Sequence, residues 1–432
     1  MTALKKYFRT LLCAAALTPV WAGAQVASLP PPEIAARNYM LVDVTANQVL
    51  ASKDVDAQIE PASLTKLMTG YLVFDALRTQ KLTLEQRLPV SERAWKMPGS
   101  RMFIDPKMQV PVDDLIKGMI VQSGNDATMA LAEGVGGTLE NFVRLMNEQA
   151  KALGMTGTTY RNPEGLTEPG HLTTARDLSI LSMRLMRDFP QYMHYYKIKD
   201  YRYEGTPAAN SKNRNTLLFR DPSVDGLKTG HTNAAGYCLV ATAQRDMPQV
   251  GGRRLLSIVL GTTSENARAN ESQKLLNWGY TAYDAVKLFE AGQAMEDALL
   301  WKGSQSSVKL GREAATVVTV PSGSSGQLST RIERQDPLIA PIAKGQQIGT
   351  LHVQLGTETL AQLPVFALEE VPEGGFFRRV WDAIRLWIRK LALGLNSQTL
   401  APNFLDCYIY GLFGIFRRVS RLRFLKRFMF SR

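Results

Sequence analysis

The stretch PASLTKLMTG (residues 61–70) decides the fold and raises the question of what Ser63 does. Ser63 and Lys66 stand at positions i and i+3, which share one face of a helix, so a hydroxyl and an amine can meet there. The proline that opens the stretch suits a helix start, and the apolar run that follows predicts a buried helix. The pair alone is weak evidence, because Ser-x-x-Lys recurs at Ser306 and Lys309 in a predicted strand.

Two more motifs follow the first in chain order. VQSGNDA places Ser123 and Asn125 on either side of a glycine, at the break between two predicted helices. VDGLKTGHT contains the single Lys-Thr-Gly of the chain, formed by Lys228, Thr229 and Gly230 in a predicted strand. A glycine has no side chain, so a substrate can approach the strand backbone closely there. The three motifs in this order are specific, although each one alone is weak.

A nucleophilic serine needs a base, and here the base is predicted to be a lysine. The chain has no Gly-x-Ser-x-Gly elbow. A helix N-terminus and a second cation lower the pKa of a lysine, and Lys66 has the first of these while Lys228 is the predicted second cation. Three histidines show no partner pattern and are interpreted as surface or packing residues: His171, His194 and His352.

The charge of the chain is concentrated at its two ends. The 432 residues carry a formal net charge of +12 and are 45% hydrophobic, enough for a large core and two domains. Three basic residues precede residue 25, and 12 basic and 3 acidic residues lie from Val371 onward, which leaves 36 of each sign between. A neutral body argues against a nucleic-acid partner.

Residues 1–24 are predicted to be a secretory signal peptide. They contain a basic start, an apolar run of about ten residues and a small-x-small cleavage site at residues 22–24. Such a run is too short to span a bilayer well. Cys238 and Cys407 are the cysteines left after cleavage, so no disulfide framework is expected, and export to a bacterial periplasm is predicted.

The mature chain is predicted to be α+β with two folded domains. Residues 25–283 have strands near the beginning, including a hairpin at residues 38–54, and again near the end before a closing helix, with helices between them, which predicts a mostly antiparallel sheet flanked by helices. Residues 284–370 show short strands separated by Gly, Pro and Ser clusters, which predicts a small all-β domain. No His, Cys and carboxylate spacing supports a metal site, and no cofactor is predicted.

The ordered motifs resemble those of the low-molecular-weight penicillin-binding proteins, which are serine-type D-alanyl-D-alanine carboxypeptidases. The resemblance runs from about residue 30 to residue 393 and includes ESQKLLNWG and VPEGGFFRRVWDAIRLWIRKLAL. It implies a serine β-lactamase/transpeptidase-like catalytic domain. It also implies removal of the terminal D-alanine from peptidoglycan stem pentapeptides through an acyl-enzyme, with β-lactam antibiotics as covalent inhibitors.

The resemblance further implies a role for each residue of the first two motifs. Ser63 would form the acyl-enzyme, and Lys66 would accept the proton of its hydroxyl. Ser123 would relay a proton toward the leaving group, and Asn125 would hold the substrate amide.

The residues around Lys-Thr-Gly would bind the substrate. Lys228 would fix the electrostatics, and Thr229 with a nearby arginine would hold the terminal carboxylate, with Arg268 as the candidate. The backbone N–H groups of Ser63 and His231 would form an oxyanion hole. A purely salt-bridging role stays open for two arginines: Arg214 and Arg268.

Two rival functions stay open. A serine β-lactamase shares the three motifs, but class A enzymes deacylate with an added glutamate, which in that family lies in an E-x-x-L-N stretch. This chain has no such stretch between Ser123 and Lys228, which favours a peptidase that β-lactams trap. A catalytically silent wall-binding scaffold would keep the fold, and the intact motifs argue against it.

The segment 371–395 is predicted to be an amphipathic membrane-surface helix. Large apolar residues recur at helical spacing from Phe377 to Leu391, and basic residues cover the other side. This pattern is typical of a helix lying on an anionic membrane interface, and docking against its own domain is the alternative. The enzyme is therefore expected at the outer face of the inner membrane. Residues 396–432 form a basic aromatic tail of unknown role.

Overall fold

The computed structural model describes residues 29–395 of the chain. The predicted signal peptide and the C-terminal tail lie outside the described residues. The domain boundaries predicted from the sequence stay predictions. The described residues fall into two compact units, one made of residues 29–293, 312–333 and 350–364, the other of residues 294–311, 334–349 and 365–395.

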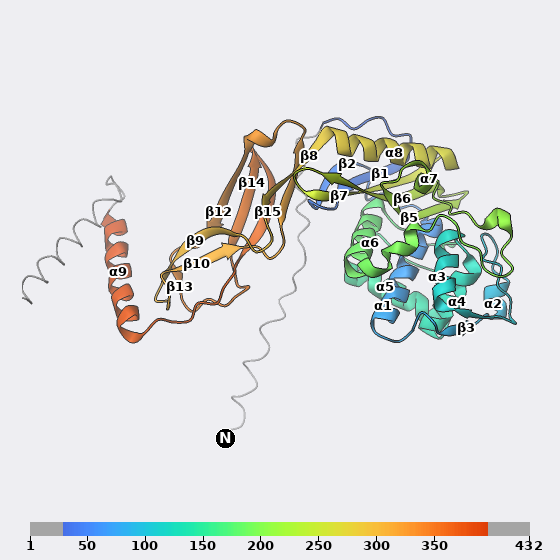
Figure 1. Cartoon of the computed structure of the whole chain (residues 1–432), viewed down its shortest axis with the longest axis horizontal. Helices are drawn as coiled ribbons and strands as arrows, with labels where there is room; N and C mark the ends of the chain where they lie inside the picture. Colours follow the sequence, from blue (N-terminus) through green and yellow to red (C-terminus); the bar gives the residue numbers. More distant parts are fainter. Residues whose placement is uncertain (1–28, 396–432) are drawn as a thin grey trace, which may run out of the picture. The chain divides into compact units, whose positions relative to one another are not determined.

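A five-stranded antiparallel sheet forms the centre of the first unit (Figure 1). Its strand order is β2-β1-β7-β6-β5, so the predicted N-terminal hairpin pairs with strands that follow about 200 residues later. This order puts β5, with the Lys-Thr-Gly motif, at one edge. The strands are β1 (Asn38–Asp43), β2 (Gln48–Lys53), β5 (Val224–Thr232), β6 (Gly236–Met247) and β7 (Gly251–Thr262).

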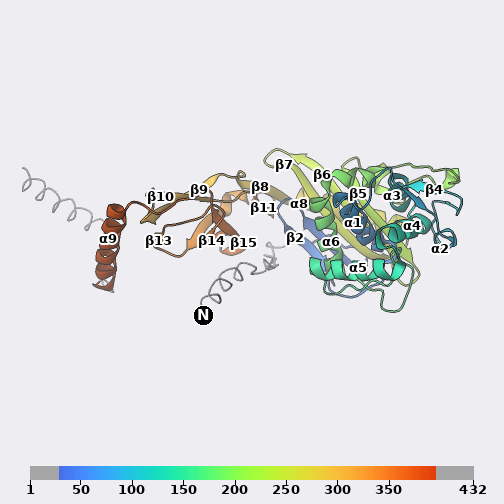
Figure 2. The same cartoon turned by 90° about the horizontal axis from the view of Figure 1, so that it is seen from below.

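Helices cover both faces of this sheet (Figures 1 and 2). Leu41 and Val259 belong to the core that includes α8 (Glu265–Ala282), whereas Met40 and Ile258 belong to the core formed with the other helices. Because strand side chains alternate between faces, a sheet buried on both sides has continuous apolar strands. The predicted antiparallel sheet flanked by helices is confirmed.

The helix α1 (Lys66–Arg78) lies at the centre of the larger core. It is apolar on all sides, which is typical of a helix surrounded by protein. The surrounding helices are α3 (Val112–Val121), α4 (Asn125–Gly136), α5 (Leu139–Leu153) and α6 (Ala175–Asp188). The smaller elements are β3 (Arg87–Pro89), α2 (Glu92–Trp95), β4 (Gln109–Pro111), the 3-10 helices η2 (Pro190–Lys197) and η3 (Ala208–Asn210), and α7 (Leu217–Arg220).

The chain after α8 is built of strands up to a last helix, which confirms the predicted all-β region. β8 (Tyr283–Phe289) pairs with β11 (Thr316–Pro321). A six-stranded sheet has the order β12-β14-β15-β10-β9-β13. Its strands are β9 (Ala294–Trp301), β10 (Ser307–Gly311), β12 (Leu328–Arg334), β13 (Leu338–Ile339), β14 (Gln347–Leu355) and β15 (Glu358–Ala367), with the 3-10 helix η4 (Ser325–Gln327) before β12 and α9 (Phe376–Leu395) at the end.

A buried ion pair stabilises the end of the central sheet. Asp43 and Arg253 are both 0% exposed, and Arg253 Nε lies 2.8 Å from Asp43 Oδ2. Arg253 also donates to the carbonyl of Tyr283 at 2.6 Å, and the Thr319 hydroxyl donates to Asp43 at 2.7 Å. These bonds pair two charges that would be costly to bury alone, although Arg253 Nη2 has no hydrogen-bond partner among the described residues.

We predict that Asp43→Ala lowers the free energy of unfolding by about 3–5 kcal/mol, because it leaves the Arg253 guanidinium buried without a counter-charge. Asp225→Ala is the matched control, since Asp225 pairs with Arg254 at a partly exposed position, and its loss should cost about 1 kcal/mol or less. Urea unfolding of both variants measures the difference. Equal losses in the two variants would contradict the role given to the buried pair.

Candidate active site

The predicted nucleophile lies on a 3-10 turn just before α1. Residues Ala62–Thr65 form the 3-10 helix η1, and Ala62 has a φ of 47°, which is uncommon for a residue with a side chain. In a 3-10 helix the side chains at i and i+3 eclipse, so Lys66 is brought directly over Ser63. The predicted helix is present, but its first turn is tighter than the α-helix that the sequence suggested.

The hydrogen bonds of Lys66 suit a neutral amine. Its Nζ lies 3.0 Å from Ser63 Oγ, and 2.7 Å from both Asn125 Oδ1 and the backbone oxygen of Glu164. Asn125 Nδ2 donates to the carbonyl of Pro98, which orients the amide oxygen toward the lysine. A neutral amine has two N–H groups and one lone pair. Two of the three partners can only accept, so a neutral Lys66 would keep its lone pair for the Ser63 hydroxyl, as a base requires, whereas an ammonium would donate to all three oxygens.

Burial lowers the pKa of both lysines of the site. It lowers the pKa of Lys66, which is 2% exposed, to about 7, against the opposing effect of the Glu164 and Asp126 carboxylates. The pKa of Lys228 lies well below its usual value, because of burial first and then because of the nearby Lys66 charge. The sequence analysis attributed the lowered pKa of Lys66 to a helix N-terminus and a second cation. The largest cause is instead burial, which a motif does not reveal.

Ser123 occupies the break between α3 and α4 in an uncommon conformation. Its φ is 60°, and its buried hydroxyl has no hydrogen-bond partner within the part of the chain that the structure describes. The next residue must be glycine, because a Cβ on Gly124 would lie 2.9 Å from the backbone nitrogen of Met102. A buried hydroxyl left without a partner costs stability, so this one is available to a bound molecule.

The edge strand β5 packs directly against the turn that carries the nucleophile. A Cβ on Gly230 would lie 3.1 Å from the backbone oxygen of Pro61 and 3.3 Å from Ala62 Cβ, so the close packing favours glycine here. Thr229 and Gly230 line a cavity of about 220 Å³ that also includes Ser63 and Ser123. The exposed His231 ring stacks on Tyr237, with centroids 3.9 Å apart.

Arg268 lines the same cavity from α8. It donates to the backbone oxygen of Gly230 at 3.3 Å and pairs with Glu265 at 2.8 Å. Arg268 therefore forms a salt bridge with Glu265 and also lines the cavity next to Thr229, so its structure is compatible with both roles considered for it. Arg214 lines the cavity as well and donates to Asn210 at 2.6 Å.

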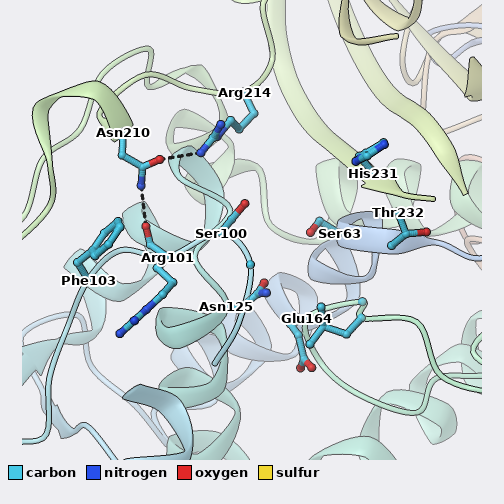
Figure 3. Close-up of a pocket in the computed structure, with 13 residues that line it drawn as sticks. Ser63, Ser100, Arg101, Phe103, Asn125, Glu164, Asn210, Arg214, His231 and Thr232 are labelled. Carbon is cyan, nitrogen blue, oxygen red and sulfur yellow. Dashed lines mark hydrogen bonds between the residues drawn. The ribbon is translucent and has the colours of Figure 1, made fainter. Parts of the chain in front are cut away.

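A larger cavity of about 400 Å³ continues from the nucleophile (Figure 3). Ser63, Asn125 and His231 form one end, and the residues of the other end come from loops that the motifs did not indicate: Ser100, Arg101, Phe103 and Asn210. The structure thus brings all nine predicted site residues to one region of the first unit, from η1, α1, β5, α8 and the α3–α4 break. Among the described residues, no group of His, Cys, Asp or Glu could hold a metal ion.

Sequence reasoning missed two residues beside the nucleophile, Glu164 and His171. His171 is buried, in agreement with the packing alternative, and its Nε2 lies 2.9 Å from the hydroxyl of Thr65, which donates to the backbone oxygen of Ala62 at 2.8 Å. Burial lowers the pKa of His171 to about 4, so the ring is neutral. It therefore supports the turn of Ser63 without charge. A lone histidine 108 positions away from Ser63 gave no signal of this contact.

The fold and the Ser63–Lys66 pair fit a serine hydrolase with a lysine base, and similar proteins specify the family. A family model described as D-alanyl-D-alanine carboxypeptidase matches residues 24–264, and one described as the C-terminal domain of penicillin-binding protein 5 matches residues 283–373. The chain is 41% identical over 363 residues to D-alanyl-D-alanine carboxypeptidase DacC of Escherichia coli K12, covering 82% of this chain and 89% of that protein.

Two further relatives agree with this assignment. The chain is 38% identical over 366 residues to D-alanyl-D-alanine carboxypeptidase DacA of Haemophilus influenzae, covering 84% of this chain and 91% of that protein. Crystal structures of penicillin-binding protein 5 from the same organism match it with a TM-score of 0.75 at 37% identity, over 80% of this chain and 100% of that chain. The chain therefore belongs to the D-alanyl-D-alanine carboxypeptidase family. The predicted family, transpeptidase-like fold and serine-type hydrolase activity are confirmed.

We predict that acylation by a penicillin rises with pH through about 7, because the reaction needs the free amine of Lys66. Lys66→Arg should lower the acylation rate by about 10²- to 10⁴-fold, since a guanidinium does not give up its proton. Stopped-flow acylation across pH, with melting temperature as the control for folding, measures both effects. Acylation of a folded Lys66→Arg variant at the unmutated rate would contradict the role of Lys66.

Proposed function

We propose that this enzyme removes the terminal D-alanine from peptidoglycan stem pentapeptides through an acyl-Ser63 intermediate. The observation that carries the proposal is the hydrogen-bond set of Lys66, which leaves the amine lone pair to Ser63 Oγ. The names of the relatives support the substrate class. Penicillin-binding protein D2 of Listeria monocytogenes, 30% identical over 58% of this chain, was solved in an ampicillin-bound form, which supports β-lactams as covalent inhibitors.

Acylation would start with Ser63 Oγ attacking the carbonyl carbon of the penultimate D-alanine as its proton passes to Lys66 Nζ. The backbone N–H groups of Ser63 and His231 would stabilise the oxyanion, and the loss of one such donor costs about 3–4 kcal/mol in comparable sites. Ser123, whose hydroxyl has room for a new partner, would pass the proton to the leaving amine. Water would then release the shortened peptide from Ser63.

The substrate would be held by the polar groups that remain free. Asn125 uses its oxygen for Lys66 and one N–H for Pro98, which leaves its second N–H for a substrate amide. Thr229 and Arg268 would bind the terminal carboxylate, and Lys228 would add positive potential behind them. A silent scaffold would have no need to bury Lys66 and Lys228 together.

We predict that incubation with a penicillin adds the mass of the drug to Ser63, and that a pentapeptide substrate releases D-alanine. Mass spectrometry of the digested adduct and a D-alanine assay measure the two results. Ser63→Ala should lose both, while Ser306→Ala should lose neither, because the second Ser-x-x-Lys is exposed. An adduct on another residue, or no adduct together with no D-alanine release, would refute the proposal.

We also propose that the enzyme is exported and held at the outer face of the inner membrane by α9. Asp382 of this helix is buried and accepts a hydrogen bond from the backbone N–H of Lys302 at 2.7 Å, while Arg385 lies over the Trp301 ring. The opposite face is exposed and apolar, formed by Phe376, Phe377, Val380, Trp381, Ile384 and Trp387. Docking and membrane contact would thus use different faces of one helix.

The chemistry of α9 favours a membrane surface over a membrane span. In the part of the chain that the structure describes, no helix is long and apolar enough to cross a bilayer. Each basic residue near an anionic surface contributes about 1 kcal/mol, and partial burial of the aromatic side chains adds to this.

Truncation after Pro372 should release the enzyme from anionic vesicles without changing its activity on small peptides. Phe377→Ser with Trp387→Ser should weaken binding while it preserves both the charge and the Asp382 contact. High salt should only weaken the attachment of the full chain, because apolar contacts persist. Vesicle sedimentation at low and high salt measures these effects. A truncated protein that still sediments with vesicles would place the anchor elsewhere.

A further inference from the structure

The loop that carries Glu164 is fastened to the nucleophile turn at three consecutive residues. The Thr69 hydroxyl donates to the backbone oxygen of Pro163 at 2.6 Å, and Lys66 donates to that of Glu164 at 2.7 Å. Gly165 packs so closely that a Cβ there would lie 1.8 Å from the backbone oxygen of Ala62. The position of Glu164 relative to Lys66 is therefore fixed by backbone contacts.

The Glu164 side chain is buried and incompletely bonded. The residue is 4% exposed, and its Oε2 has no hydrogen-bond partner among residues 29–395. Burial raises the pKa of this carboxyl, whereas the nearby Lys66 charge lowers it. A buried carboxyl without a partner lowers the stability of the protein. Its position next to a buried amine therefore points to a role in the chemistry of that amine.

A second buried carboxylate near Lys66, that of Asp126, is already committed. It accepts hydrogen bonds from the backbone N–H groups of Met102, Phe103 and Ile104, at 2.8, 2.7 and 3.3 Å. Of the two carboxyl groups that influence the pKa of Lys66, Glu164 is therefore the one with an oxygen that accepts no hydrogen bond among the described residues.

We infer that Glu164 is a positioning residue that supplies the counter-charge for the Lys66 ammonium formed when Ser63 is acylated. This inference rests on the proposed acyl-Ser63 mechanism. The proton leaves Ser63 Oγ as this oxygen bonds to the carbonyl carbon, and Lys66 Nζ becomes positively charged in a buried site. An ionised Glu164 stabilises that charge, and Glu164 itself exchanges no proton with the substrate.

The orientation of Glu164 supports action through Lys66. In Figure 3 its carboxyl group points away from Ser63, so it does not face the reacting hydroxyl. The other charged groups around the site are distributed over the elements packed against it. They are Asp126 on α4, Lys228 on β5, Arg268 on α8, Arg214 in the loop before α7, and Glu168 beyond Glu164 in its own loop.

The test is the pH profile of penicillin acylation in Glu164→Gln. Removal of a carboxylate makes Lys66 easier to deprotonate, so the acid limb of the profile should move about one to two pH units lower. The maximal rate should fall roughly three- to tenfold, because a weaker base accepts the serine proton. Glu168→Gln removes a charge from the same loop and should leave the acid limb in place, since Glu168 bonds to Asn162 rather than to Lys66.

A second measurement does not depend on catalysis. The full-length protein is labelled with [13Cε]lysine for NMR. The Lys66 signal is assigned by its loss in Lys66→Arg. This signal is then titrated with pH in the unmutated protein and in Glu164→Gln. Its midpoint should fall by the same one to two units, approximately. An unmoved midpoint or acid limb would overturn the inference even if Ser63 is acylated. Normal acylation with slow release of the acyl group alone would place Glu164 in deacylation and also overturn it. Absence of any adduct in the unmutated enzyme would instead refute the proposed function, while the titration would still decide the role of Glu164.

Discussion

The burial of one amine governs the rest of this site. Burial of Lys66 is the largest cause of its lowered pKa, and two of its three polar neighbours can only accept, so a neutral amine has its lone pair available to the serine hydroxyl. The same burial would make a protonated Lys66 expensive, so each charge nearby alters its chemistry. Lys228 adds to the cost of the ammonium, and the carboxylates of Asp126 and Glu164 reduce it.

Exclusion of water from Lys66 requires several distant segments to pack without gaps around η1. Gly230 lets β5 contact the turn from one side, and Gly165 lets the Glu164 loop contact it from another. The neutral His171 ring forms a hydrogen bond with the Thr65 hydroxyl and adds no charge. Larger side chains at either glycine would separate these segments and admit water. The two glycines therefore affect the pKa of Lys66 as well as the backbone geometry.

Sequence patterns predicted the parts of this arrangement that are local or that follow a motif. The spacing of Ser63 and Lys66 predicted their contact, and the order of strands and helices along the chain predicted an antiparallel sheet flanked by helices. The sequence did not reveal the 3-10 turn, in which Ala62 is in close contact with β5 and with the Glu164 loop, segments about 170 and 100 residues away along the chain. The sequence also gave no sign that Glu164 and His171 lie beside the nucleophile. Their contacts are with residues about 100 positions away in the chain, which no local pattern reveals.

The site holds several features that oppose folding, and their concentration in one place is informative. Ala62 and Ser123 have positive φ angles, the Ser123 hydroxyl and one oxygen of Glu164 lack hydrogen-bond partners among the described residues, and two lysines are buried near one another. Strained residues and unpaired buried groups each cost about 1–3 kcal/mol, and they persist only where the surroundings enforce them. The two cores on either face of the sheet supply that enforcement. A bound substrate can supply the partner that the Ser123 hydroxyl lacks, whereas the positive φ angles and the burial of the two lysines remain a cost of holding the catalytic groups in place.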